Sequence, residues 1–380
     1  MDDGPMIVEL FRYADLDAET LAALVEIRDA DPSYDSPFFA VEFARQLSLV
    51  RDDTRIAVIR DANGIAGYWA MHVRPDKWAR PIGAAFSDWH GPVFRSGVNV
   101  NDADDLLGAA GLKGMTVNGL QVDAAGNLAT GEIVGVGQAH LENGDAEAFL
   151  INQRQRFPKY GKNIRRAERL IEKEFGGMSF TADDRSTDAL DWLLARKSAQ
   201  YKMTGLHDVL APDWVQRFMR NLHSCRTPRF GGRLSTLRFG DSLVAAELDL
   251  ISDTIVHGWI TVFDNDYARY SPGHLLIKEI ICDMPRTGHV VTDMGAGDSA
   301  YKKYYETYVL PSHSGVVRSD KGLRPLAGSW RLAERVFPEK ISLNLAKIRR
   351  RTDQIVGTDL DSGARVSGFL AALSGRRANK

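Results

Sequence analysis

Two stretches of the chain share one pattern of residues, and this repeat constrains the fold more than any other feature. Residues 55–73 read RIAVIRDANGIAGYWAMHV and residues 233–251 read RLSTLRFGDSLVAAELDLI. Aligned without gaps, their arginines, aliphatic residues and polar turn coincide, and each reads as strand, turn, strand. The offset, 233 minus 55 or 178 residues, is about one domain length. The pattern predicts two copies of one fold joined by a helical connection, although two unrelated hairpins could share it by chance.

Length and composition agree with an ordinary enzyme of two domains. A chain of 380 residues exceeds what one hydrophobic core usually serves. Its 48 Lys and Arg against 50 Asp and Glu leave a net charge of -2, so we expect no DNA partner. The cysteines, Cys225 and Cys282, lie in no CxxC pair and near no histidine cluster, which argues against disulfides and against a metal site. We also expect a cytoplasmic protein, since no run of about 18 apolar residues occurs.

The second half of the chain contains a strand, a tight loop and a helix in succession. Residues 254–263 are apolar and β-branched, and a helical pattern of apolar residues begins at Leu275. Pro272 suits the first helical position, and Gly273 keeps side chains away from the exposed amides. Such a helix start favours anions, because its free N–H groups and the positive end of the helix dipole point outward together.

A second predicted strand and its loop complete this region. Residues 289–294 read as a strand that contains Asp293 near its end, and a glycine-broken turn follows at 295–297. Residues 298–305 are aromatic and basic, and we expect a helix there. Tyr301 and Lys302 would then lie in its first turns, beside the strand end.

These motifs resemble those of the acyltransferases of the GNAT superfamily related to CelD and FemAB proteins, many of them associated with bacterial exopolysaccharide biosynthesis. The resemblance rests on the Ser-Pro-Gly loop, the strand ending in Asp, the Gly-x-Gly turn and the Tyr-Lys pair. It extends over roughly residues 34–310. Further similar segments are 36–39, 80–83, 87–91, 162–166 and 197–201. The loop itself departs from the usual GNAT phosphate pattern, since it has one glycine and a proline.

The resemblance implies an α/β (α+β) fold of two tandem GNAT-like domains, with mixed, mostly antiparallel sheets flanked by helices. We expect an N-terminal GNAT-like domain at 1–150, a basic helical connector at 151–180, a catalytic GNAT domain at 181–325 and a basic helical tail at 326–380. The implied activity is acetyl-CoA-dependent, or other acyl-CoA-dependent, N-acetylation of an amino sugar, nucleotide-linked or lipid-linked, for an exopolysaccharide or adhesin. Two alternatives stay open: aminoacyl transfer from aminoacyl-tRNA, as in FemAB proteins, and a degenerate fold that responds to cyclic di-GMP.

Acyl transfer to an amine needs a base for the ammonium and an acid for the leaving thiolate. Glu247 is a carboxylate inside an apolar strand pattern, where burial would raise its pKa, and Asp293 ends a strand; both rank as the base ahead of His257. Tyr301 is placed as GNAT enzymes place a tyrosine general acid. The alternatives are an exposed edge-strand position for Glu247, a helix cap for Asp293 and plain packing for Tyr301.

The acyl carrier would be held at the loop before the helix. We expect its pyrophosphate on Ser271 and on the backbone amides of Gly273, His274 and Leu275. The resemblance places the donor for the thioester carbonyl at a backbone N–H near residues 260–262. No metal is expected.

Four further residues are candidates for binding the acceptor. Asp88 and His90 belong to a loop, residues 87–91, that combines hydroxyl, carboxylate, aromatic and imidazole groups suited to a sugar. Arg165 lies in a basic amphipathic pattern at 162–173, and Lys302 could meet a phosphate. A plain turn and a solvated connector helix are the alternatives.

The C-terminal residues 331–380 hold eleven Lys or Arg against five Asp or Glu. Arg349, Arg350 and Arg351 follow an apolar helical face, and with Asp353 they contain an Arg-x-x-Asp spacing that resembles cyclic di-GMP sites in exopolysaccharide regulators. We expect a regulatory nucleotide site or peripheral docking on the anionic inner membrane. A packing helix with a frayed end is the alternative.

Overall fold

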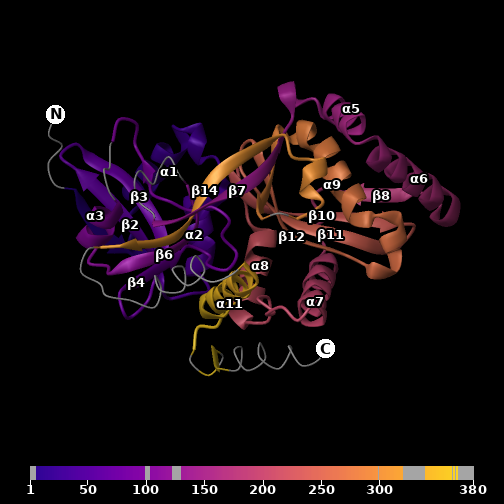
Figure 1. Ribbon diagram of the computed structural model, residues 1–380. Coiled ribbons are helices and arrows are strands. Elements are labelled where there is room, and N and C mark those ends of the chain that lie inside the picture. Colours follow the sequence, from indigo (N-terminus) through magenta and orange to yellow (C-terminus); the bar gives the residue numbers. More distant parts are fainter. Residues whose placement is uncertain are drawn as a thin grey trace.

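The structure is a computed structural model that describes residues 6–98, 103–121, 130–297, 299–319, 339–361, 363 and 365–366. Its 14-stranded mixed sheet runs through both halves of an elongated molecule, with helices packed on the two faces (Figure 1). None of the helices within these ranges combines the length and the apolar character that a membrane span needs.

Apart from the two-residue strands β5 and β9, the two halves repeat one order of elements. The first half consists of β1 (Ile7–Phe11), α1 (Ala18–Asp29), α2 (Val41–Ser48), β2 (Thr54–Asp61), β3 (Gly64–Val73), β4 (Trp78–Pro81), β5 (Val93–Phe94), α3 (Ala103–Ala109) and β6 (Gly114–Gln121). The second half consists of β8 (Met178–Thr181), α7 (Thr187–Met203), α8 (Asp213–Ser224), β9 (Arg226–Thr227), β10 (Phe230–Phe239), β11 (Ser242–Ile251), β12 (Ile255–Phe263), α9 (Pro272–Asp283) and β13 (Val291–Ala296).

The repeated hairpins pair in the same register. Arg55 lies opposite Met71 in β2 and β3, and Arg233 lies opposite Asp249 in β10 and β11, which is the same pair 178 residues later. The registers shift at equivalent places, after Ile59 and after Leu237. The strand after each hairpin also runs parallel to a later strand, β4 to β6 and β12 to β13. The predicted fold of two tandem α/β units, with mixed and mostly antiparallel strand pairing flanked by helices, is confirmed.

The last strand of each half is hydrogen-bonded to the sheet of the other half. β7 (Thr130–His140) follows β6 in the chain but pairs with β13, and β14 (Tyr308–Arg318) follows β13 but pairs with β6. β7 and β14 also pair with each other. This exchange joins the strands into one sheet, whereas the sequence led us to expect separate sheets. Strand partners that lie far apart in the chain leave no local pattern in the sequence.

Helices cover both faces of the sheet. Side chains from α1, α2, α7 and α8 enclose the largest core, in which Phe43 of the first half meets Phe218 of the second at 5.7 Å between ring centroids. α3 covers the other face of the first half, where Leu106 and Leu107 are buried. α9 covers the corresponding face of the second half. The shared core makes the two halves one packed body.

Two helices connect the halves. α5 (Ala146–Arg156) and α6 (Pro158–Phe175) lie at the outer end of the second half (Figure 1). The amphipathic helix predicted at 162–173 is confirmed, because α6 buries Ile164, Ala167 and Ile171 and exposes its basic residues. The helix predicted at 298–305 is wrong: the described residues there contain only a 3₁₀ turn, Lys302–Tyr304.

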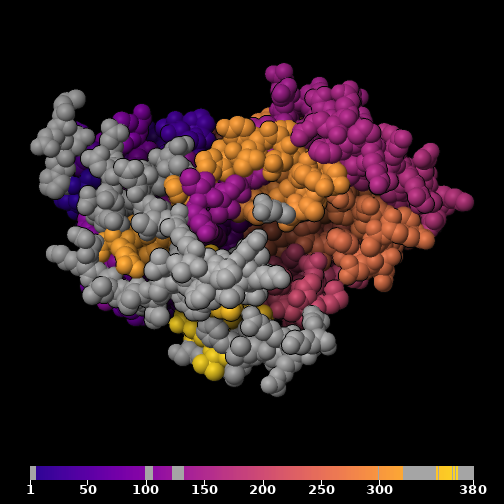
Figure 2. Space-filling model, in the orientation of Figure 1, coloured from indigo at the N-terminus to yellow at the C-terminus, as the bar shows by residue number. Residues whose placement is uncertain are grey.

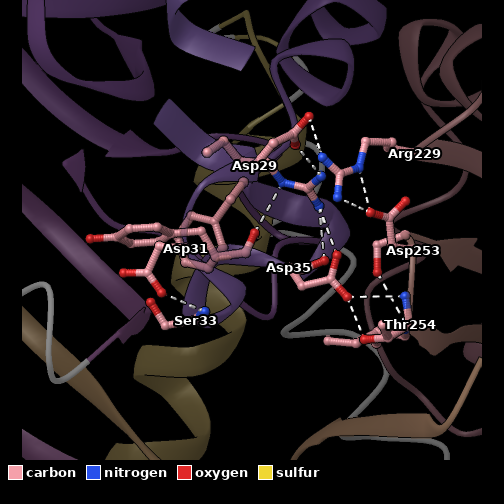
Figure 3. A network of polar contacts seen from close by, with 12 residues as sticks. Asp29, Asp31, Ser33, Asp35, Arg229, Asp253 and Thr254 are labelled. Carbon is pink, nitrogen blue, oxygen red and sulfur yellow. Dashed lines mark hydrogen bonds and ion pairs between the residues drawn. The ribbon is translucent and has the colours of Figure 1, made fainter. Parts of the chain in front are cut away.

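Polar contacts join the halves at the surface (Figure 3). Arg229, in the turn before β10, forms ion pairs with Asp29 at the end of α1, at 2.6 Å, and with Asp253. Asp35 accepts a hydrogen bond from the backbone N–H of Thr254 at 3.1 Å. These contacts fix the loop between β11 and β12, and therefore the start of β12, against the first half.

Candidate functional site

β12 and β13 separate near the middle of the second half. They pair in parallel over three positions only, the last being His257 opposite Asp293. β12 then continues to Phe263, while the register of β13 with β7 shifts after Asp293. Beyond His257, the edge of β12 therefore faces no strand. Backbone N–H and C=O groups on such an edge need other partners, which a bound molecule can supply.

A cavity of about 590 Å³ occupies this opening. We call it the β12–β13 cavity. Its walls come from β12, the start of α9, the turn after β13, α7 and one loop of the first half, and Figure 2 shows the surface hollowed beside α7. The residues used below that line it are Asp88, Lys197, Gly258, Thr261, Ser271, Gly273, His274, Tyr301 and Lys302.

The start of α9 forms one wall. Ser271 adopts a left-handed conformation, with φ of 56°, which turns the chain directly into Pro272 at the first helical position. The carbonyl of Ser271 accepts hydrogen bonds from the amides of both His274, at 3.0 Å, and Leu275, at 3.1 Å. Of the three amides expected to cradle a pyrophosphate, only that of Gly273 is not bonded to Ser271. The turn lies at the cavity, but offers fewer amides than the sequence suggested.

Glu247 lies directly behind the β12 wall. It is buried at 6% exposure on β11, opposite Thr261, whose hydroxyl donates a hydrogen bond to its carboxylate. Gly258 separates it from the cavity, since a Cβ atom at that position would lie 2.8 Å from Glu247 Oε1. The absence of a side chain at Gly258 therefore leaves the carboxylate open toward the cavity.

A second carboxyl lies behind Glu247 on the same face of β11. Asp249 is fully buried and accepts a hydrogen bond from the Ser235 hydroxyl at 2.9 Å. Burial, followed by the negative charge of Glu247, raises the pKa of Asp249 well above its usual range. Two close carboxylates in such a place retain a proton between them. Asp249 therefore holds its proton to higher pH than an exposed aspartate does.

Three groups from both halves form a charged chain at the other wall. His257 Nε2 lies 2.8 Å from Asp88 Oδ2, and its Nδ1 lies 3.2 Å from Asp293 Oδ1. Burial alone would lower the pKa of His257. The nearby carboxylates of Asp293 and Asp88 have the larger effect and raise this pKa to about 10. His257 is thus a buried cation that holds the Asp88 carboxylate of the first half at the cavity. Gly295 permits this approach, because a Cβ there would lie 2.7 Å from Asp88 Oδ2.

Asp293 is surrounded by donors. Its carboxylate accepts hydrogen bonds from Trp89 Nε1 at 2.9 Å, Gln138 Nε2 at 2.8 Å and the Gly295 amide at 2.8 Å, in addition to the contact with His257. Burial opposes ionisation of this group, but His257 and these donors lower its pKa. A carboxylate stabilised in this way is a weak base. The geometry gives Asp293 an orienting role toward His257.

The remaining polar groups of the cavity are a tyrosine and two lysines. Burial, together with the charges of Glu247 and Asp88, raises the pKa of Tyr301, so its hydroxyl keeps its proton at neutral pH. Lys302 Nζ donates to the carbonyls of Gly295, at 2.8 Å, and Ala296, at 2.9 Å. Lys197 Nζ donates to the Thr261 carbonyl at 2.8 Å, and burial lowers its pKa.

Residues 158–303 match the family described as acetyltransferase (GNAT) domain. This part of the chain is therefore similar to a GNAT acetyltransferase domain. Among solved structures, FemX aligns with 82% of this chain and 98% of its own, at 10% identity and a TM-score of 0.50, which supports the shared fold. A tandem GNAT protein of the clavulanic acid pathway covers 84% and 100%, at 10% identity and a TM-score of 0.47. The C-terminal domain of a putative lysylphosphatidylglycerol synthetase from Agrobacterium fabrum covers 83% and 95%, at 12% identity and a TM-score of 0.49. A search of curated proteins found no match.

Some predicted site residues lie away from the β12–β13 cavity. His90 is buried in the first half, stacked on Trp69 at 6.3 Å between ring centroids, and burial lowers its pKa to about 3. Arg165 is exposed on α6 and is not among the cavity-lining residues. The structure brings together Asp88, Glu247, Tyr301, Lys302 and the Ser271–Leu275 turn, but neither His90 nor Arg165.

The predicted tail residues that the structure describes lie on the first half, apart from the β12–β13 cavity. α11 (Glu339–Thr358) places Arg349 and Asp353 at a small cavity of about 190 Å³, where Asp353 lies 3.9 Å from Arg80. Arg351 is half-buried, and the side chain of Arg350 lies outside the described residues. Whether this end of α11 binds a nucleotide or a membrane stays a prediction.

Three residues at the site were not predicted from the sequence. Lys197 belongs to one of the segments that carry the family resemblance, and that was its only signal. Gly258 and Gln138 had none, because one acts through the lack of a side chain and the other reaches Asp293 through the exchanged strand β7. Across the described ranges, no three His, Cys, Asp or Glu side chains gather in a way that could hold a metal ion.

Proposed function

We propose that this protein is an N-acyltransferase that acylates the primary amine of an amino sugar, with acyl-CoA as the donor. The observation that carries the proposal is the position of the buried Glu247 carboxylate. No side chain at Gly258 covers it on the side of the cavity, which lies where the parallel strands β12 and β13 separate. The resemblance to CelD and FemAB proteins further favours an acceptor used in an exopolysaccharide or adhesin, made at the cytoplasmic side of the membrane.

The cavity suits the acyl end of the donor. Acyl-CoA supplies the acyl group as a thioester, whose carbonyl oxygen needs a hydrogen-bond donor. The edge of β12 beyond His257 presents backbone groups without a strand partner. Lys197 and Lys302 place two ammonium groups on the walls, and Gly273 offers a free amide beside them. These positive groups favour a polyanionic carrier.

The acceptor amine would enter against Asp88. Its ammonium can form a charge-assisted hydrogen bond with the Asp88 carboxylate, which His257 and Asp293 hold in place. This contact comes from the first half, so the acceptor would be recognised by both halves. Hydroxyl groups of a sugar ring can meet the carbonyls and lysines around it.

The transfer itself needs one base and one acid. Glu247 takes a proton from the ammonium, and the amine nitrogen attacks the thioester carbon. The C–N bond forms and the C–S bond breaks. Tyr301 gives its proton to the leaving sulfur and regains one from the nitrogen, so the products are an amide and a thiol, and the proton on Glu247 passes to water.

The test combines activity with binding. Purified protein is incubated with acetyl-CoA and either glucosamine or UDP-glucosamine, and thiol release and product mass are followed. We expect thiol release only with an amine present, and a product heavier by one acetyl group. Separate calorimetric titrations use acetyl-CoA, aminoacyl-tRNA and cyclic di-GMP. Binding and turnover with aminoacyl-tRNA alone would assign the FemAB-like alternative, and binding of cyclic di-GMP alone would assign the regulatory one.

A further inference from the structure

A second cavity lies between α5 and the start of β14. Its volume is about 490 Å³, which is within the range of small-molecule sites. We call it the α5 groove and define it by His140, Asp145, Phe149, Asn152, Arg156 and Tyr308. Tyr304 and Tyr305 also line it, whereas Tyr301 and Lys302 line the β12–β13 cavity, so one short turn separates the two.

The groove presents an exposed aromatic surface. Tyr308 is 54% exposed, and its ring lies 5.5 Å from the ring of His140, centroid to centroid. Phe149, which also lines the groove, is buried. An exposed tyrosine at a concave site commonly marks a binding surface, because one face is apolar and the hydroxyl remains wet.

The polar side chains of the groove include acidic and basic groups, and they can both donate and accept hydrogen bonds. Within the described residues, the side chains of Glu142, Asn152 and Gln155 make no hydrogen bond. Arg156 is held by the carbonyl of Glu306 at 3.3 Å, with its guanidinium over the ring of Phe157. Carboxylate, amide and guanidinium groups together match a ligand that donates and accepts in many directions without a net charge.

We propose that the α5 groove binds a neutral saccharide. A sugar ring can lie on the face of Tyr308 while its hydroxyls meet the amides and charged groups of α5. The proposal goes beyond the acyl transfer inferred for the β12–β13 cavity, because it concerns a separate site. It does not depend on that function, since the binding needs no acyl donor.

The groove is connected to the first cavity through two sets of contacts. His140 Nε2 lies 2.9 Å from Gln138 Oε1, and Gln138 Nε2 donates to Asp293, which contacts His257. Tyr305 lines the groove, and its hydroxyl lies 3.0 Å from Nδ1 of His274, which lines the β12–β13 cavity. A ligand on His140 therefore lies two hydrogen bonds from the carboxylate that orients His257.

The experiment is calorimetric titration of the full chain, without acyl donor, using β-linked di-N-acetylglucosamine as the neutral probe. Glucosamine and glucuronate serve as cationic and anionic probes. We expect the disaccharide to bind best, and Tyr308→Ala and Asn152→Ala each to weaken it about fivefold to tenfold. Val309→Ala, at the next position of β14, is the matched control: Val309 is exposed but does not line the groove, so this variant should bind as the wild type does.

The melting temperature of each variant is measured as well. A loss of binding is attributed to the substituted side chain only if the variant melts at the same temperature as the wild type. The proposal is overturned if the wild type does not bind the disaccharide, if Tyr308→Ala binds it as tightly as the wild type, or if glucuronate binds more tightly than the disaccharide. It is also overturned if Tyr301→Ala loses binding while Tyr308→Ala keeps it, because the sugar would then occupy the β12–β13 cavity.

Discussion

At the scale of single residues, the site depends on two glycines as much as on its carboxylates. Gly258 leaves Glu247 open to the cavity, and Gly295 lets Asp88 approach His257. Glu247 and Asp293 were visible in the sequence because each interrupts an apolar strand pattern. The contact between Asp88 and His257 was not, since 169 residues separate the partners and only the folded sheet brings them together.

Gly258→Ala should slow acyl transfer by about 10- to 100-fold, because the added methyl group lies over Glu247 Oε1 and displaces it. The turnover of the variant is compared with the wild type at saturating substrate, with circular dichroism to show that it is folded. Gly108→Ala is the control: this glycine lies in α3, where a Cβ would meet its nearest neighbour at 3.6 Å. Equal turnover in Gly258→Ala and wild type would rule out access through this position.

His257 makes stability depend on pH in a defined window. Its folded pKa, about 10, lies above the unfolded value of about 6.5, so the imidazolium stabilises the folded state fully below pH 6.5. That contribution is lost as the pH rises toward 10. Urea unfolding is measured at pH 6.5, 8 and 10. The difference in free energy of unfolding between the wild type and His257→Gln should decrease over this range. A difference that stays constant over the three pH values would contradict the charged state of His257.

At the scale of elements, the sequence predicted the regular parts and missed the turn that follows β13. The two hairpins and α6 follow from local alternation and helical spacing. The predicted helix at 298–305 fails because its tyrosines pack elsewhere. Tyr304 stacks on Tyr160 at 4.5 Å between ring centroids, and Tyr305 is fully buried with its hydroxyl 2.7 Å from that of Tyr160. Packing against α6 thus overrides the local helix preference.

The end of α11 is a second element that only tertiary contacts explain. Trp214 Nε1, in the second half, donates to the carbonyl of Thr358 at 2.8 Å, and Arg74, in the first half, donates to that of Val356 at 2.8 Å. Both bonds satisfy carbonyls of the last helical turn, which have no partner within the helix. The last turn of α11 is therefore attached to both halves.

Trp214→Phe should lower the free energy of unfolding by about 1 to 3 kcal/mol, because it leaves the Thr358 carbonyl without its donor and removes part of a buried ring. Urea denaturation measures the change. Trp192→Phe, on α7, is the matched control, since Trp192 is only half-buried and makes no hydrogen bond to the described residues of α11. Equal losses in the two variants would show that the bond to α11 contributes nothing specific.

At the scale of the whole molecule, strand exchange makes the halves one unit. β13 pairs with β7 from the first half, and β7 delivers Gln138 to Asp293 at the site. The sequence predicted two tandem copies from the repeat, but the exchange depends on pairings between strands far apart in the chain. The surface contacts of Arg229 with Asp29 and Asp253 reinforce the same junction (Figure 3).

The exchange predicts a single cooperative unfolding transition. Neither half has a complete sheet without the strand of the other, so neither should persist alone. Urea unfolding followed by far-ultraviolet circular dichroism and by tryptophan fluorescence should give coincident midpoints. Two separated transitions would mean that the halves fold independently, contrary to the shared core and the exchanged strands.

The central claim is that Glu247 is the base for acyl transfer in the β12–β13 cavity. The most direct test is the rate of thiol release from acetyl-CoA with an amino sugar, compared among the wild type, Glu247→Gln and Asp249→Asn. We expect Glu247→Gln to be slower by roughly 10² to 10⁴. Asp249→Asn should lose less than about tenfold, because Asp249 lies behind Glu247 and an amide oxygen can keep its hydrogen bond from Ser235. Full activity of folded Glu247→Gln would contradict the account.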